Sequence, residues 1–288
     1  MNTQLRPDYK RVQAFFGDTR TERQLIEHYR LERVLADKIK HTPQGARAQI
    51  YADAYRELFQ SVPDHPQQRI EMQDARRRHI RSLWRRLHRR LKNKVFLEIG
   101  CGDAVLSASL AAWTSQTYAL DVTDKLISRT TLPRNLEVLL TTGADIPLHD
   151  GVIDLAFSDQ LMEHLHPDDA IAQLEQIFRV LKPGGSYLCV TPNKVTGPHD
   201  VSSFFDYEAT GLHLCEYMST ELFQLFKQVG FRKVRFYVSA YGFEARIPAT
   251  VLRSLENRLQ ALPSLTRARV TRNPYMAALA GLDVVGTK

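Results

Sequence analysis

Hydrophobic positions recur with helical spacing in the first third of the chain, and glycine is almost absent there. Apolar side chains return every three or four residues within about 21–39, 43–62 and 68–91. This spacing predicts three amphipathic helices, each with one apolar face that needs a partner surface. We therefore expect residues 1–93 to form an amino-terminal helical region.

From residue 94 onward, short apolar runs alternate with amphipathic stretches. The runs predict seven strands, at 94–99, 116–121, 135–140, 152–158, 185–191, 231–238 and 281–287. The stretches between them predict helices at about 103–113, 123–129, 168–181 and 219–229, with a helical insertion at about 242–280. Alternating strands and helices favour an α/β domain at 94–288, with a mostly parallel sheet and helices on both faces.

Composition narrows the class of protein. The chain has 288 residues, of which 43% are hydrophobic and 25% are charged, as in ordinary globular domains. The three cysteines are far apart and form no C-x-x-C pair, so neither a disulfide scaffold nor a zinc ribbon is expected. The first residues lack the apolar run of a secretory signal, and no stretch is long enough to span a bilayer. We expect a cytoplasmic protein.

Positive charge is concentrated in the third predicted helix. The net charge is +7, and the segment 76–94 holds ten arginines and lysines with no acid. The simplest interpretation is the solvated face of a helix that packs on the following domain. Peripheral contact with lipid headgroups and a surface for an anionic substrate or nucleic acid are the alternatives. Nucleic acid is disfavoured because few aromatic residues interleave the charges. Nothing in the pattern predicts an oligomeric state.

The segment 95–106 has the pattern of a strand, a tight turn and a helix. Gly100 and Gly102 allow the sharp turn and the close approach of a ligand at the sheet edge where open α/β sheets bind nucleotides. Asp121 ends the next predicted strand, at a spacing that suits two ribose hydroxyls. The dinucleotide fingerprint G-x-G-x-x-G is absent because Val105 stands where its third glycine would be.

This segment resembles the E/D-x-G-x-G-x-G motif of class I S-adenosylmethionine (SAM)-dependent methyltransferases, with Ala104 in place of the last glycine. Two later segments are similar to motifs of the same family. Residues 143–148 resemble the stretch that contacts adenine, and 181–186 match its L-K-P-G-G turn. The resemblance covers about 94–240. It implies a Rossmann-like fold with a seven-stranded, mostly parallel sheet whose last strand is antiparallel beside the fifth.

The resemblance also implies SAM as cofactor and S-adenosylhomocysteine as product. The turn would contact the methionine part of SAM. The acid at the end of the second strand would bind the ribose, and the segment after the third strand would contact the adenine. The implied cofactor-binding residues are Glu98, Gly100, Cys101, Gly102, Asp121, Val122, Asp145, Ile146 and Gln160.

The acceptor side of the site is expected after the fourth strand. Glu163 and His164 resemble part of the E-x-x-E-H motif of ubiquinone-biosynthesis O-methyltransferases and plant small-RNA methyltransferases, in which two Glu and two His hold a divalent metal. Here Gln160 replaces the first Glu, and His213 supplies a later His. The lost carboxylate disfavours a divalent cation, so no metal ligand is predicted.

Three roles remain open for these residues. Glu163 and His164 could orient the segment after the strand, His164 could act as a general base, or the group could hold a metal. The candidate catalytic residues are therefore His164, Glu163 and His213, and His199 is a further candidate on the acceptor side.

The sequence thus predicts a SAM-dependent methyltransferase with a small-molecule, sugar or lipid-linked glycan acceptor, methylated preferentially at oxygen. An RNA methyltransferase is the alternative among enzymes, for which the basic segment is the only support. A SAM-binding module without catalytic activity is the alternative from another class. The acceptor itself is not predicted, because loops and appended helices build acceptor pockets.

Overall fold

The computed structural model describes residues 3–65, 70–128, 132–141, 143–240 and 243–288. The amino-terminal part contains helices α1 (Tyr9–Phe16), α2 (Glu22–His41), α3 (Gln44–Ser61) and α4 (Ile70–Leu87). The remainder begins with β1 (Val95–Ile99), α5 (Val105–Ala111), β2 (Gln116–Asp121), β3 (Leu136–Leu140), β4 (Ile153–Asp159) and α6 (Pro167–Val180). It continues with β5 (Leu181–Pro192), α7 (Ser219–Val229), β6 (Lys233–Ala240), β7 (Phe243–Ile247), α8 (Ala249–Gln260), α9 (Ser264–Thr271) and β8 (Gly281–Thr287).

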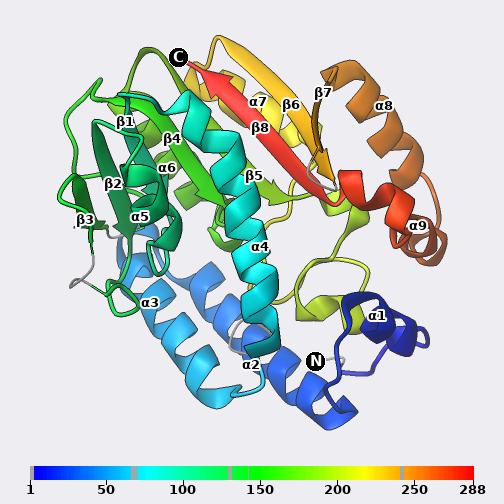
Figure 1. The fold of residues 1–288 in the computed structure, drawn as a ribbon. Coiled ribbons are helices and arrows are strands. Elements are labelled where there is room, and N and C mark those ends of the chain that lie inside the picture. Colours follow the sequence, from blue (N-terminus) through cyan, green and yellow to red (C-terminus); the bar gives the residue numbers. More distant parts are fainter. Residues whose placement is uncertain (1–2, 66–69, 129–131, 142, 241–242) are drawn as a thin grey trace.

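These strands form one sheet in the order β3-β2-β1-β4-β5-β8-β6-β7 (Figure 1). Neighbouring strands from β3 to β5 are parallel, whereas β8 is antiparallel to both β5 and β6. The predicted mostly parallel sheet and the antiparallel last strand beside the fifth are therefore confirmed.

The sheet has one strand more than the sequence predicts. We expected a helical insertion at about 242–280, but β7 occupies its first residues and pairs antiparallel with β6. Apolar residues at 243, 245 and 247 alternate with Glu244 and Arg246, which is the pattern of a strand and not of a helix. The described remainder of the insertion is largely helical, as predicted.

The prediction of a helix at about 123–129 is wrong for residues 123–128, the part of this segment that the structure describes, because these residues form no helix. Side chains satisfy the backbone there instead of helical hydrogen bonds. Asp121 accepts a hydrogen bond from the Thr123 amide, and the Thr123 hydroxyl accepts one from the Lys125 amide. Such local bonds compete with helix formation. Residue 129 lies outside the described residues.

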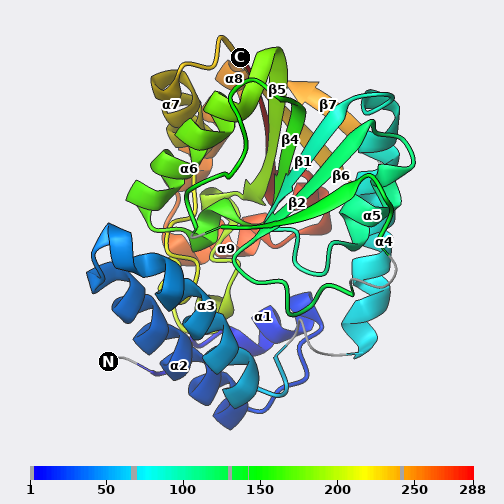
Figure 2. The same ribbon diagram turned by 90° about the vertical axis from the view of Figure 1, so that its left-hand side faces the viewer.

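Helices cover both faces of the sheet, with α4 and α5 on one side and α6 and α7 on the other (Figures 1 and 2). Leu83 and Leu87 of α4 pack in one buried cluster with Phe96, Leu110 and Phe157. The apolar stripe of the basic helix is therefore buried on the sheet.

Arg86 of α4 and Arg90, just after this helix, pair with acids of the sheet. Arg86 lies 3.0 Å from Asp283 and 3.2 Å from Glu244, and Arg90 lies 3.7 Å from Glu244. This part of the basic segment is neutralised within the fold.

The helices α2 and α3 lie beyond the carboxyl ends of the central strands (Figure 2). Their apolar residues, such as Leu35, Ile39 and Leu58, belong to the same buried cluster as Leu97 and Ile146. The two helices thus form part of the main core at the edge where a ligand is expected. None of the helices in the described part of the chain is long and apolar enough to cross a bilayer.

Candidate active site

The turn between β1 and α5 has the backbone conformation that its glycines permit. The φ angles of Gly100 and Gly102 are +72° and +58°, and that of Ala104 is +58°. A Cβ atom on Gly100 would lie 3.1 Å from the side chain of Leu161, so this position also requires the absence of a side chain. The amides of Gly100 and Cys101 both donate to the carbonyl of Leu120, which fixes the turn on β2.

Asp121 closes this turn from the end of β2. Its Oδ2 accepts a hydrogen bond of 2.8 Å from the Gly102 amide, and its Oδ1 accepts one from Thr123. Burial raises the pKa of Asp121. A carboxylate has about four acceptor positions, so two remain for the hydroxyls of a ribose.

Glu98 is buried at the end of β1 and is bound to the first turns of α5. Its Oε2 accepts hydrogen bonds from the amide and the hydroxyl of Ser107, at 3.0 and 2.5 Å. Burial raises the pKa of Glu98 to about 8, although the bonds to Ser107 oppose the shift. Glu98 thus holds α5 against β1 through its Oε2. The other carboxylate oxygen of Glu98, Oε1, has no partner among the described residues.

Three side chains that sequence reasoning missed lie at the same turn. Asp159, at the end of β4, accepts a hydrogen bond of 2.6 Å from His79 of α4, and this bond raises the pKa of His79. The other oxygen of Asp159, Oδ1, is buried and has no hydrogen-bond partner among the described residues.

Arg76 of α4 pairs with Asp103 at 2.7 Å. Its Nη2 lies 4.0 Å from where a Cβ on Gly102 would be. A lone buried carboxylate oxygen and a guanidinium therefore flank the turn. Asp159 could have been found from the sequence, because it is an acid at the end of the fourth predicted strand. Arg76 and His79 could not, because their place at the turn depends on how α4 packs.

The predicted adenine residues lie beside a cavity of about 330 Å³. Gly143, Ala144 and Asp145 line one side, and residues 44–51 of α3 line much of the rest. Asp145 accepts a hydrogen bond from the Thr141 hydroxyl, and the buried Ile146 accepts one at its carbonyl from Arg179. The loop after β3 is thus fixed at the wall of this cavity, and α3 covers it.

The remaining predicted cofactor residues lie along the same edge of the sheet. Cys101 is buried in the turn, and burial raises the pKa of its thiol. Val122 follows Asp121 directly, and Gln160 follows β4 as an exposed residue with a φ of +52°.

Three predicted catalytic residues, Glu163, His164 and His213, meet in a buried cluster although His213 is about fifty residues away in sequence. Each offers one nitrogen or oxygen ligand atom, and these atoms lie within 4.8 Å of one another. The rings of His164 and His213 cross edge to face at 4.7 Å. We call these three residues the acceptor cluster.

Glu163 is fully buried. Its Oε2 accepts a hydrogen bond of 2.9 Å from the Thr191 hydroxyl, and its Oε1 is buried with no partner in the part of the chain that the structure describes. Burial raises the pKa of Glu163 to about 7.

The two histidines of the cluster are held in different charge states. His164 donates from Nδ1 to the carbonyl of Leu212, and burial together with His213 lowers its pKa to about 3, so its ring is neutral. Burial alone would lower the pKa of His213, but its bond of 2.7 Å to Glu216 and nearby acids raise the pKa to about 9.

The acceptor cluster offers two ligand atoms to a divalent cation, and a third once His213 loses a proton. In each histidine Nδ1 bonds to a carbonyl or carboxylate. Nε2 of the neutral His164 is therefore available for coordination, whereas the protonated His213 would have to release the proton on its Nε2. Histidine ligands of metals are typically oriented in this way. The unpartnered Oε1 of Glu163 would complete a set of two imidazoles and one carboxylate.

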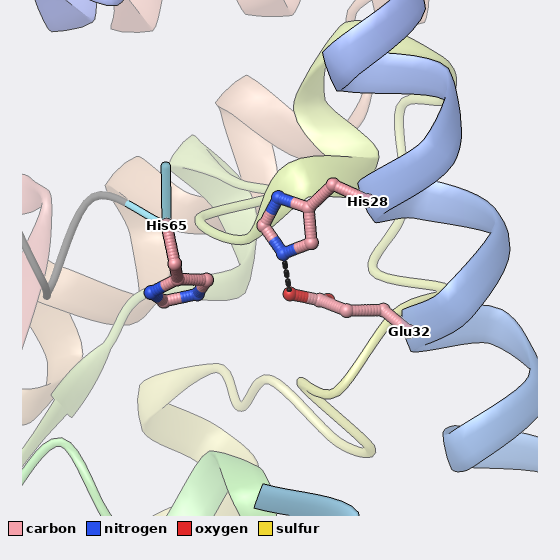
Figure 3. A group of neighbouring side chains, drawn as sticks. All are labelled: His28, Glu32 and His65. Carbon is pink, nitrogen blue, oxygen red and sulfur yellow. Dashed lines mark hydrogen bonds and ion pairs between the residues drawn. The ribbon is translucent and has the colours of Figure 1, made fainter. Parts of the chain in front are cut away.

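A second group, His28, Glu32 and His65, is buried near the cluster (Figure 3). His28 accepts at Nδ1 from Arg20 at 2.5 Å, so its Nε2 carries the proton and donates to Glu32 at 2.7 Å. A nitrogen that carries a proton offers no lone pair to a metal. This group is therefore a hydrogen-bonded support and not a metal site.

Glu32 connects this support to the acceptor cluster. Its Oε2 accepts a hydrogen bond of 3.0 Å from the amide of Leu212, whose carbonyl accepts from His164. A Cβ on Gly211 would lie 2.3 Å from Glu32, so the close approach depends on that glycine. Helix α2 thus holds the peptide that precedes His213.

His199 is held by its neighbours instead of facing the cluster. Its amide donates to Glu216 at 2.7 Å, and its Nε2 lies 2.9 Å from the Thr196 hydroxyl and 3.2 Å from the Asn193 carbonyl. Burial lowers its pKa. These bonds give His199 a structural role in the loop after β5.

Comparison with known proteins identifies the region that carries these residues. Residues 97–189 match the family described as "Methyltransferase domain". Over 151 residues the chain is 31% identical to a Mycolicibacterium smegmatis protein named "Probable S-adenosylmethionine-dependent methyltransferase", covering 52% of this chain and 56% of that protein. A Mycobacterium tuberculosis protein of the same name is 30% identical over 157 residues, covering 54% of each. The chain thus spans little more than half the length of these relatives.

A solved structure shows the same fold. The crystal structure of a SAM-dependent methyltransferase from Archaeoglobus fulgidus has a TM-score of 0.50 and 16% identity, covering 74% of this chain and 94% of that one. The Rossmann-like methyltransferase fold predicted from the sequence is confirmed, with β7 as an addition at the edge of the sheet.

Proposed function

We propose, from the premise that residues 97–189 are a SAM-dependent methyltransferase domain, that this chain methylates a hydroxyl of a small-molecule, sugar or lipid-linked acceptor. One observation carries the proposal: the glycine turn closed by Asp121 and the buried acceptor cluster follow strands that end at the same edge of the sheet. A donor and an acceptor bound there would be side by side. A cytoplasmic location stays a prediction.

The residues around the turn suit each part of SAM. Asp121 would bind the ribose hydroxyls, and Asp145 and Ile146 the adenine at the cavity beneath α3. The unpartnered oxygen of Asp159 suits the ammonium of the methionine end, and Arg76 suits its carboxylate. Charged hydrogen bonds of this kind are short and directional.

The acceptor cluster would bind the hydroxyl that receives the methyl group. The sulfonium is already reactive, so the protein mainly aligns the acceptor and excludes water. Glu163, whose Oε1 has no partner among the described residues, would take the hydroxyl proton, while the Thr191 hydroxyl holds the other oxygen of Glu163. A divalent cation on the cluster is the second candidate, favoured by the two Nδ1 hydrogen bonds, and would lower the pKa of the hydroxyl.

The two alternative functions predict different results. An RNA methyltransferase would bind RNA through the basic segment 76–94, in which Arg76, Arg86 and Arg90 pair with acids of the sheet domain. Other arginines of this segment, such as Arg78, Arg81 and Arg85, are exposed. A module without catalytic activity would bind S-adenosylhomocysteine and turn over no acceptor. Radiolabelled methyl transfer to RNA, glycan and small-molecule pools separates these cases.

Asp121→Ala tests the cofactor site. We expect the affinity for S-adenosylhomocysteine, measured by titration calorimetry, to fall by ~1.5–3 kcal/mol, the scale of hydrogen bonds to a charged group. Asp150→Ala, at an exposed carboxylate, is the control and should bind normally. Unchanged affinity in Asp121→Ala would refute the ribose assignment.

Asp159→Asn tests recognition of the methionine end. Loss of the charge should weaken S-adenosylhomocysteine by about 1–3 kcal/mol, because the ammonium loses its counter-ion. Adenosine, which lacks the amino-acid end, should bind the variant and the original protein equally. Equal losses for both ligands would mean that Asp159 acts through the fold and not on the ammonium.

A further inference from the structure

A small polar cavity is lined in part by Glu216, the residue bonded to His213 of the acceptor cluster. Its volume is about 150 Å³, and it is lined by the segment after β5, the loop before α7 and helices α8 and α9. Glu216 lines the cavity and is bonded to His213, so the cavity is one side chain away from the cluster. The lining residues include Lys194, Tyr207, Gln260 and Arg267.

Arg267 is buried in the wall of this cavity without a counter-ion. It is 8% exposed, and its guanidinium donates a hydrogen bond of 3.1 Å to the neutral amide of Gln260. Within the described residues no carboxylate lies at ion-pairing distance from it. A buried charge is ordinarily paired because its desolvation is costly. The missing partner is therefore an anion that the chain does not supply.

A second arginine nearby has the same deficit. Nη2 of Arg272, just after α9, is buried without a hydrogen-bond partner in the described structure. Arg272 interacts electrostatically with Tyr207, which also lines the cavity. Arg6 stacks over the Tyr207 ring at 3.7 Å, and its own charge is paired with Asp8 at 2.8 Å.

Neither acid of the cavity lining forms an ion pair with Arg267 in the described structure. Glu216 accepts hydrogen bonds from His213 and from the amide of His199, both at Oε1. Glu208 is exposed to solvent. Lys194 has a long contact, 3.7 Å, with Glu221 outside the lining. Arg267 is therefore a buried cation of this lining that has no carboxylate partner among the described residues.

We propose that this cavity binds an anionic oxygen-bearing group of the methyl acceptor, a phosphate or a carboxylate, through Arg267 with Lys194 as second cation. The inference rests on the proposed function and adds the chemical class of the acceptor. A guanidinium binds such groups with two parallel hydrogen bonds. The cavity is smaller than the ~300–1,000 Å³ of sites that enclose a whole ligand, so it takes one group, while the hydroxyl reaches the cluster beyond Glu216.

Binding of inorganic phosphate and of acetate to the protein saturated with S-adenosylhomocysteine tests this site. We expect Arg267→Gln to weaken the anion at least tenfold, whereas Arg269→Gln, an exposed arginine on the same helix, leaves it unchanged. Preference for phosphate or for acetate identifies the group. Lys194→Gln should cause a smaller loss, and it provides a second variant should Arg267→Gln fail to fold.

The affinity for S-adenosylhomocysteine, measured in the same samples, separates the two proposals. This affinity should be the same in all variants. If the original protein does not bind S-adenosylhomocysteine at all, the proposed cofactor site is refuted, whereas the proposal for the cavity is not. Equal anion affinity in the original protein, Arg267→Gln and Lys194→Gln would overturn the anion site. So would turnover that is the same for acceptors with and without an anionic group.

Discussion

Glu163→Gln should lower turnover by ~10²–10⁴-fold, the range for loss of a positioned acid or base, while the affinity for S-adenosylhomocysteine stays unchanged. The substitution keeps the size of the side chain and an oxygen for the Thr191 hydroxyl, but removes the carboxylate that would take the proton or hold a cation. Single-turnover methyl transfer together with calorimetry measures both quantities.

Glu175→Gln is the matched control for this experiment, because Glu175 is exposed on α6. It should have normal turnover. Normal turnover in Glu163→Gln as well would remove Glu163 from the chemistry, and His164→Ala would then test whether the cluster has any role beyond structure.

Chelation separates the two chemistries of the acceptor cluster. Loss of turnover in EDTA, with recovery in Mg²⁺ or Mn²⁺, would assign the cluster to a cation. Turnover that is insensitive to EDTA would indicate that Glu163 itself removes the proton of the acceptor hydroxyl, without a metal ion. Cofactor binding should be indifferent to the treatment in both cases, because Asp121 and the turn are separate from the cluster.

Glu32→Ala should destabilise the protein by about 2–6 kcal/mol, because each of two buried donors left without its acceptor costs about 1–3 kcal/mol. It leaves His28 and the Leu212 amide without their acceptor. Chemical denaturation measures the change in the free energy of unfolding. The loop that carries His213 would also lose its support from α2, so turnover should fall in the folded fraction.

Glu27→Ala on the same helix is the control. Glu27 is exposed and pairs only with Arg23. Its removal should change stability by no more than about 0.5 kcal/mol, as for ordinary surface substitutions. Equal stability of Glu32→Ala and Glu27→Ala would contradict the support that α2 gives to the loop.

The sequence by itself determined the glycine turn after β1 and most of the secondary structure. Gly100 and Gly102 are required by their positive φ angles, and Asp121 ends its strand because the apolar run stops there. Such features depend on neighbours in the chain, so local pattern reveals them. The expected helix at 123–129 failed where side chains of Asp121 and Thr123 captured the backbone amides, a competition that hydrophobic spacing does not report.

Only the tertiary structure decided the chemistry of the acceptor side. Glu163 and His213 meet because the chain returns to the same sheet edge, and burial among particular neighbours gives His164 and His213 opposite pKa shifts. The link from Glu32 to Leu212 depends equally on how α2 packs. A sequence names the residue types, but distances and desolvation between segments far apart in the chain arise only when the core has formed.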